Sequence, residues 1–146
     1  MKAALLFGLI LFVTQPTIAQ DNVDLKDIVG FPCYFEGSQT KTVEKVRKLL
    51  KASNYEAISG LLTSKNEGEK YLAVIVLERL AGLGQYNLND KEKDLVSKLK
   101  TSDELVSVCS GCTYFDKVPM KKLLSNDEII GSRYWLDRVI KKIKRS

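Results

Sequence analysis

Two cysteines, Cys109 and Cys112, lie three positions apart in a chain that has one further cysteine, Cys33, and no histidine. A Cys-x-x-Cys pair can form a redox-active dithiol, half of a metal site or a structural disulfide. The absence of histidine removes Ser-His and Cys-His activation of a nucleophile and the usual ligand of catalytic zinc, copper and iron. Haem attachment is excluded as well, because Thr113 stands where the Cys-x-x-Cys-His motif requires histidine.

Three disulfides are possible among these cysteines, and each leaves one thiol over. A bond from Cys33 to Cys109 or Cys112 closes a loop of about 80 residues and should contribute roughly 4–5 kcal/mol, against about 2 kcal/mol for Cys109–Cys112. We therefore expect a structural disulfide that involves Cys33 and ties the irregular segment 31–38 to the body of the protein near Gly111. An inert Cys109–Cys112 bond, a redox-active Cys109–Cys112 pair and reduced core thiols are the alternatives.

The sequence assigns no catalytic, cofactor-binding or metal-ligating residue. A structural zinc site takes four ligands, and three cysteines without histidine leave it one short. The chain contains no Gly-x-Ser-x-Gly, P-loop or dinucleotide fingerprint. We therefore expect no cofactor and a non-enzymatic protein. The alternative function is a thiol–disulfide redox protein or sensor that uses Cys109 and Cys112.

The first 19 residues have the form of a secretory signal peptide. Lys2 precedes an apolar run that ends at Val13, and Thr17-Ile18-Ala19 supplies a small-x-small cleavage site. The run is too short to span a bilayer, which needs about 20 residues. We therefore expect an exported protein, periplasmic or secreted, whose mature chain begins at Gln20. Such a location permits disulfides.

Apolar residues repeat with helical spacing along most of the chain. The repeat predicts an α-helical domain over residues 42–146, preceded by an irregular segment over 20–41 that holds Cys33. Residues 102–104 (Ser-Asp-Glu) indicate the start of one helix, which would place the Cys-x-x-Cys pair near its apolar face. No strand is expected. The predicted fold class is therefore all-α, a compact bundle of short antiparallel helices.

Two stretches of the chain, Ile58–Leu80 and Leu123–Ile140, are alike. Each has a Leu-Leu pair, a polar turn, and a basic residue followed by tyrosine at the start of a longer helix. This pattern resembles HEAT-type α-helical repeats and covers under half of the mature chain. The resemblance implies HEAT-like helix packing and a binding surface on stacked helices, with no catalytic residue to carry over. The alternative is an unrelated bundle whose helices are alike through their amphipathicity.

Four aromatic residues flank the cysteines: Tyr34, Phe35, Tyr114 and Phe115. If a disulfide brings their segments together, they would form an interaction surface, whereas the alternative is that they fill the core. We expect the partner to be another protein and the chain to be a protein-binding or structural module. The formal charge of +5 comes without a basic stripe interleaved with aromatics, so nucleic acid is not expected.

The C-terminal residues 138–145 form a basic amphipathic stretch. Such a stretch can contact an anionic membrane surface. Cations at a helix C-terminus also complement the helix dipole, and we prefer this interpretation. The sequence leaves the oligomeric state open.

Overall fold

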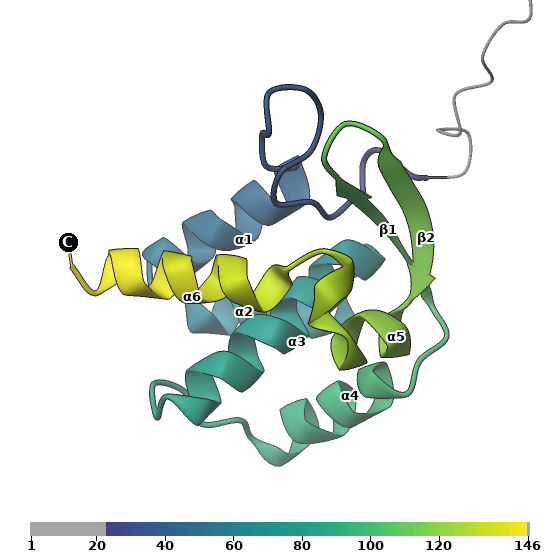
Figure 1. Ribbon diagram of the computed structural model, residues 1–146. Helices are drawn as coiled ribbons and strands as arrows, with labels where there is room; N and C mark the ends of the chain where they lie inside the picture. The colour runs from purple at the N-terminus through teal and green to yellow at the C-terminus, as the bar shows by residue number, and fades with distance from the viewer. Residues whose placement is uncertain (1–22, 146) are drawn as a thin grey trace, which may run out of the picture.

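The structure is a computed structural model that describes residues 23–145, so the expected signal peptide and the start of the mature chain lie outside the described residues. In the described part, six α-helices pack together and a two-stranded antiparallel sheet lies at one side of them (Figure 1). In chain order the elements are α1 (Lys41–Lys51), α2 (Tyr55–Gly60), α3 (Glu67–Gly82), α4 (Asp90–Lys100), β1 (Leu105–Ser110), β2 (Tyr114–Pro119), α5 (Met120–Ser125) and α6 (Ser132–Ile143). Short 3₁₀ turns, Leu61–Thr63 and Asp127–Ile129, precede α3 and α6.

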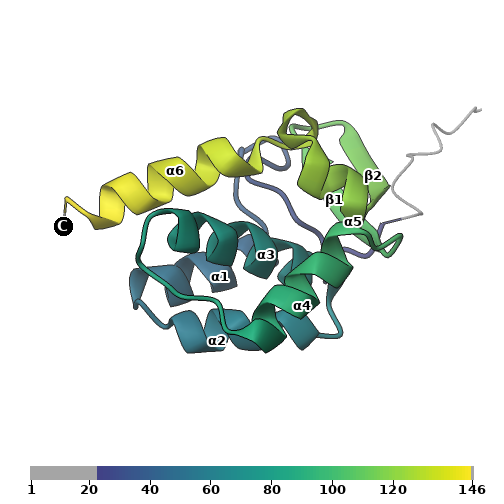
Figure 2. The same ribbon diagram turned by 90° about the horizontal axis from the view of Figure 1, so that it is seen from below.

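Helix α3 is the centre of the fold. Asn66 caps its start, because the Asn66 side chain accepts a hydrogen bond from the Glu69 amide over 2.9 Å. The run from Tyr71 to Leu77 is buried on every side, since α3 contacts α1, α2, α4, α5, α6 and β1. Figure 2 shows α3 between α6 on one side and α2 on the other. A helix whose apolar residues cover its whole circumference requires such neighbours.

The surrounding helices are amphipathic. Helix α1 buries Val43, Val46 and Leu50, which recur at helical spacing, and leaves its lysines outside. Helix α4 begins in a capping box: Asn89 and Glu92 each accept a hydrogen bond from the other's backbone amide. Within residues 23–145, no helix is long and apolar enough to cross a membrane.

The strands overturn the all-α fold class. The expected helix over Leu105–Ser110 is strand β1, which pairs antiparallel with β2 so that Cys109 faces Phe115 and Ser110 faces Tyr114. Leu105, Val108, Cys109 and Cys112 have the i, i+3, i+4, i+7 spacing of a helix face, but Leu105 and Cys112 are exposed, and all four residues from Val106 to Cys109 are buried. Burial of four consecutive residues indicates a strand covered on both faces. The expected all-α bundle with HEAT-like packing is therefore wrong, and the chain is mixed α and β.

The turn of this hairpin explains why a helix does not continue through it. Gly111 has φ +62°, in the left-handed region that glycine occupies without a steric penalty. The chain reverses there, and β2 then ends at Pro119, the N-cap of α5. β-Branched Val106 and Val108 favour the strand, in keeping with their propensity.

Candidate functional site

A disulfide joins Cys33 to Cys109, with a Cα–Cα distance of 5.8 Å and both residues fully buried. The two cysteines are 76 positions apart in the sequence, and the bond between them attaches the N-terminal segment 23–40 to the hairpin. The disulfide expected to involve Cys33 is present, and the partner of Cys33 is Cys109. Its position beside β1 matches the predicted tether near Gly111, because Cys33 pairs with Gly111 in a parallel bridge.

Backbone hydrogen bonds hold the N-terminal segment along β1 on both sides of the disulfide. The Val29 amide donates to the Ser107 carbonyl over 2.8 Å, and the Cys109 amide donates to the Val29 carbonyl over 2.9 Å. At the hairpin turn, the Gly111 amide donates to the Pro32 carbonyl over 2.8 Å. The Gly111 carbonyl accepts from the Tyr34 amide over 3.1 Å. The segment thus follows β1 in a parallel direction, which covers the side of β1 that β2 leaves unpaired.

Gly30 allows this close approach. A Cβ atom added at Gly30 would overlap the sulfurs of both Cys33 and Cys109, and it would lie 2.8 Å from the Cys109 carbonyl oxygen. A real Cβ does not fit at these separations, so the disulfide and the backbone pairing require glycine at this position.

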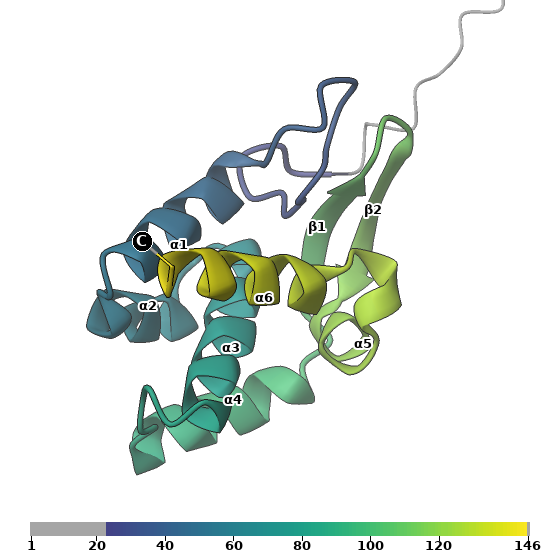
Figure 3. The same ribbon diagram turned by 60° about the vertical axis from the view of Figure 1, so that its left-hand side comes forward.

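The four aromatic residues predicted as an interaction surface belong to two segments that meet at the β1–β2 turn, and we call them the aromatic tip (Tyr34, Phe35, Tyr114 and Phe115). The Tyr34 and Phe115 rings are 5.9 Å apart. Phe115 also packs against the cluster of Ile28, Cys33 and Cys109. In Figure 1 the loop that follows Cys33 and the β1–β2 turn rise beside each other above α1, and Figure 3 shows the same two segments from another side.

The members of the aromatic tip differ in exposure. Phe35 is 95% exposed, whereas Tyr34 and Tyr114 are about 40% exposed and Phe115 is half-buried. Tyr34 has φ +62°, a left-handed conformation that is costly for a bulky residue. Burial and the neighbouring Asp116 carboxylate raise the pKa of Tyr114, so its hydroxyl stays neutral.

Cys112 lies in the turn between the strands, and its thiol is exposed and free. Since Cys109 is bonded to Cys33, the structure contains no Cys109–Cys112 bond. The predicted placement of the Cys-x-x-Cys pair on a helix face is wrong, because Cys109 is in β1 and Cys112 follows it in a turn. Among the described residues, no group of three or more acidic or cysteine side chains is arranged to hold a metal ion.

Two buried polar clusters lie elsewhere and support the fold. The Tyr71 hydroxyl donates to Ser132 over 2.7 Å, and Ser132 donates to Asp127 over 2.6 Å, which joins α3 to the start of α6. Burial raises the pKa of Tyr71. Around Glu92, Ser59 and Tyr86 donate to the same carboxylate oxygen. These groups satisfy each other, as buried polar groups must.

The comparisons with known proteins found no match: no family model, no curated protein and no solved structure is similar to this chain. The resemblance to HEAT repeats therefore rests on the residues of the two stretches alone. The site is accordingly interpreted from its geometry.

Sequence reasoning missed one surface, the outer face of α1. A shallow, open hollow of about 830 Å³ runs along this helix. Its lining includes Lys41, Lys45 and Lys48, which recur at i, i+4 and i+7 and so share one helix face. That spacing is the signal in the sequence that could have predicted this surface.

Proposed function

We propose that this chain is an exported binding module that recognises another protein through the aromatic tip. The observation that carries the proposal is Phe35, a phenylalanine that is 95% exposed on a loop next to a buried disulfide. A large apolar side chain held outside the core gains free energy only when a partner covers it. Aromatic anchors of this kind dominate the energetics of protein interfaces.

The loop that carries Phe35 is held at both ends. The Cys33 amide donates to the Ser38 carbonyl over 2.8 Å, and the Gly37 amide donates to the Tyr34 carbonyl over 3.1 Å. Together with the disulfide, these bonds restrict the loop before any partner arrives. A preorganised loop loses less conformational entropy on binding, which favours affinity.

The left-handed backbone of Tyr34 supports the same interpretation. A non-glycine residue at φ +62° costs about 1–3 kcal/mol, and such strain persists where the surrounding structure fixes it. Here it turns the loop so that Tyr34 contacts Phe115 while Phe35 remains exposed. Strained residues cluster at functional sites.

Export is part of the proposal. The Cys33–Cys109 disulfide is compatible with an oxidising location. The N-terminal signal-peptide pattern, Lys2 followed by the apolar run to Val13, indicates the route. Periplasmic and secreted destinations share this chemistry.

Site-specific photocrosslinking in the producing cells tests the proposal. A benzophenone amino acid replaces Phe35 in one strain and Leu83, which is 37% exposed at the end of α3, in the control strain. We expect a discrete crosslinked band, of fixed mass, from position 35 and none from position 83. Equal crosslinking from both positions, or none from either, would contradict a binding role for the aromatic tip.

A further inference from the structure

We propose that the hollow along α1 binds an acidic segment of the partner protein. The inference rests on the proposed function and names the chemistry of the partner. It concerns a second surface, adjacent to the aromatic tip, and its experiment can fail while the aromatic tip still binds.

Charge is segregated in this chain. Residues 41–51 and 132–145 hold eleven of the 23 lysines and arginines but only Glu44 and Asp137 of the 18 acidic residues. The remainder of the chain holds twelve cations and sixteen acids, so it is net negative. In Figures 1 and 2, α1 and the C-terminal half of α6 lie toward the same end of the molecule, so both basic segments contribute positive charge to that end. A positive field of this kind attracts acidic partners.

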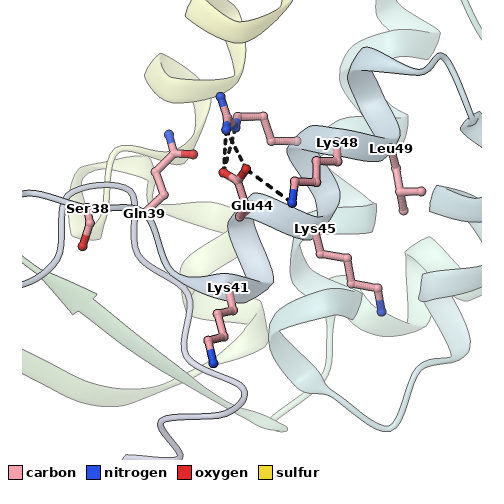
Figure 4. Close-up of a pocket in the computed structure, with 8 residues that line it drawn as sticks. Ser38, Gln39, Lys41, Glu44, Lys45, Lys48 and Leu49 are labelled. Carbon is pink, nitrogen blue, oxygen red and sulfur yellow. Dashed lines mark hydrogen bonds and ion pairs between the residues drawn. The ribbon is translucent and has the colours of Figure 1, made fainter.

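The hollow concentrates this charge along α1. Figure 4 shows Lys41, Lys45 and Lys48 spaced along the helix, with Glu44 between them. Arg47 also lines the hollow, so four cations and one carboxylate surround it. The aliphatic stems of the lysines and the Leu49 side chain add apolar surface to the lining.

The local acidic groups leave much of this charge available. Glu44 accepts from Arg47 over 2.6 Å and lies 3.8 Å from Lys48, so one carboxylate serves two cations. Lys45 pairs with Glu69 over 2.5 Å. Within residues 23–145, no carboxylate lies within ion-pairing distance of Lys41. The lining therefore has more cations than its own carboxylates neutralise, which favours a ligand that brings carboxylates.

The position of the hollow connects it to the aromatic tip. Ser38 and Gln39 line one end of the hollow and directly follow the loop that carries Phe35. A partner that covers Phe35 can therefore continue along α1. A flat membrane fits this surface less well, because none of the large exposed apolar residues in the described part lies on α1.

The test measures binding of a fluorescein-labelled octaglutamate peptide to the mature protein by fluorescence anisotropy. The variant Lys41→Gln/Lys45→Gln/Lys48→Gln removes the charges of the hollow. The matched control, Lys91→Gln/Lys93→Gln/Lys98→Gln, removes the same number of lysines from α4. We expect the α1 triple variant to bind about tenfold more weakly and the α4 variant about as tightly as wild type. The single variant Lys41→Gln, which breaks no ion pair, should weaken binding about twofold and guards against misfolding of the triple variant.

Equal weakening by both triple variants would overturn the proposal, because only net charge would then matter. Binding to phosphatidylglycerol vesicles without binding to octaglutamate would overturn it in favour of a membrane surface. Phe35→Ala separates the two hypotheses. This variant should bind octaglutamate as tightly as wild type. Failure of crosslinking from position 35 therefore contradicts the role of the aromatic tip, whereas failure of octaglutamate binding contradicts the role of the hollow.

Discussion

The Tyr34 ring lies 5.9 Å from the Phe115 ring, although Tyr34 belongs to the N-terminal segment and Phe115 to the second strand of the hairpin. Two links flank this contact: the Cys33–Cys109 bond and the hydrogen bond from the Tyr34 amide to the Gly111 carbonyl. The aromatic tip therefore exists because the N-terminal segment is attached to β1. Changes that detach this segment should disperse the aromatic tip.

The disulfide should contribute strongly to stability. Replacing Cys33 and Cys109 together by serine removes a bond that closes 76 positions of sequence. We expect the free energy of unfolding to fall by about 4 kcal/mol, since a long loop regains much entropy in the unfolded chain. Urea unfolding followed by circular dichroism measures the change.

Cys112→Ser is the matched control for the disulfide. Its thiol is exposed and free, so the free energy of unfolding should change by less than about 0.5 kcal/mol.

Peptide mapping without reduction should recover Cys33 linked to Cys109. A structural bond should also have a reduction potential below about −300 mV, whereas a potential of about −120 to −230 mV would support thiol–disulfide exchange instead.

Gly30→Ala should destabilise the same attachment without removing a cysteine. The new methyl group would overlap both bonded sulfurs and lie 2.8 Å from the Cys109 carbonyl, so the segment must move away from β1. We expect a loss of about 1–3 kcal/mol, as in other overpacked cores. Gly60→Ala in α2 is the control, because a Cβ there meets nothing within 4 Å. Equal urea midpoints for the two variants would show that Gly30 is not tightly enclosed.

Periodicity predicted the helices well where a helix has one apolar face. Val43, Val46 and Leu50 of α1 are buried as expected, and α3 is buried on nearly all sides. Periodicity failed in Leu105–Ser110, because Leu105, Val108, Cys109 and Cys112 have the spacing of a helix face, whereas the segment is a strand covered on both sides. The coverage comes from the N-terminal segment and α3, which are distant in sequence.

The candidate site was predictable in part. Loop entropy favoured a disulfide from Cys33, and that bond brings Tyr34 toward Phe115. The choice of Cys109 over Cys112 was not predictable, because it depends on the hairpin that places one cysteine in a covered strand and the other in a turn. The hollow along α1 depends on how Gln39 approaches the helix, which local spacing does not encode.

Core and surface aromatics should respond differently to truncation. Phe31 and Trp135 are buried, and their rings lie 4.7 Å apart, so alanine at either position should cost about 3–5 kcal/mol. Phe35→Ala should change the free energy of unfolding by less than about 0.5 kcal/mol, because Phe35 is 95% exposed. Urea unfolding of the three variants measures both. A large loss from Phe35→Ala would show that this ring serves the fold and would remove the main support for a binding role.

Glu92 should make stability depend on pH in the acid range. Burial alone would raise the pKa of Glu92, but hydrogen bonds from Ser59, Tyr86 and the Asn89 amide hold this pKa below its ordinary value of 4.5. The folded state therefore favours the carboxylate. The contribution of the Glu92 carboxylate to the free energy of unfolding is fully present above pH 4.5, the pKa of this group in the unfolded chain. It is lost as pH falls through the lower pKa of Glu92 in the folded protein.

The variant Glu92→Gln tests this dependence. It keeps the shape of the side chain but removes the charge that Ser59 and Tyr86 bond, so we expect a loss of about 1–3 kcal/mol at pH 7. The difference from wild type should shrink as pH falls from 4.5 through the lower folded pKa of Glu92, because the wild-type carboxylate becomes protonated over this range. Urea unfolding from pH 7 to pH 3 measures it, with Glu56→Gln on the exposed side of α2 as the control. A difference that stays constant across this range would mean that the charge of Glu92 does not stabilise the fold.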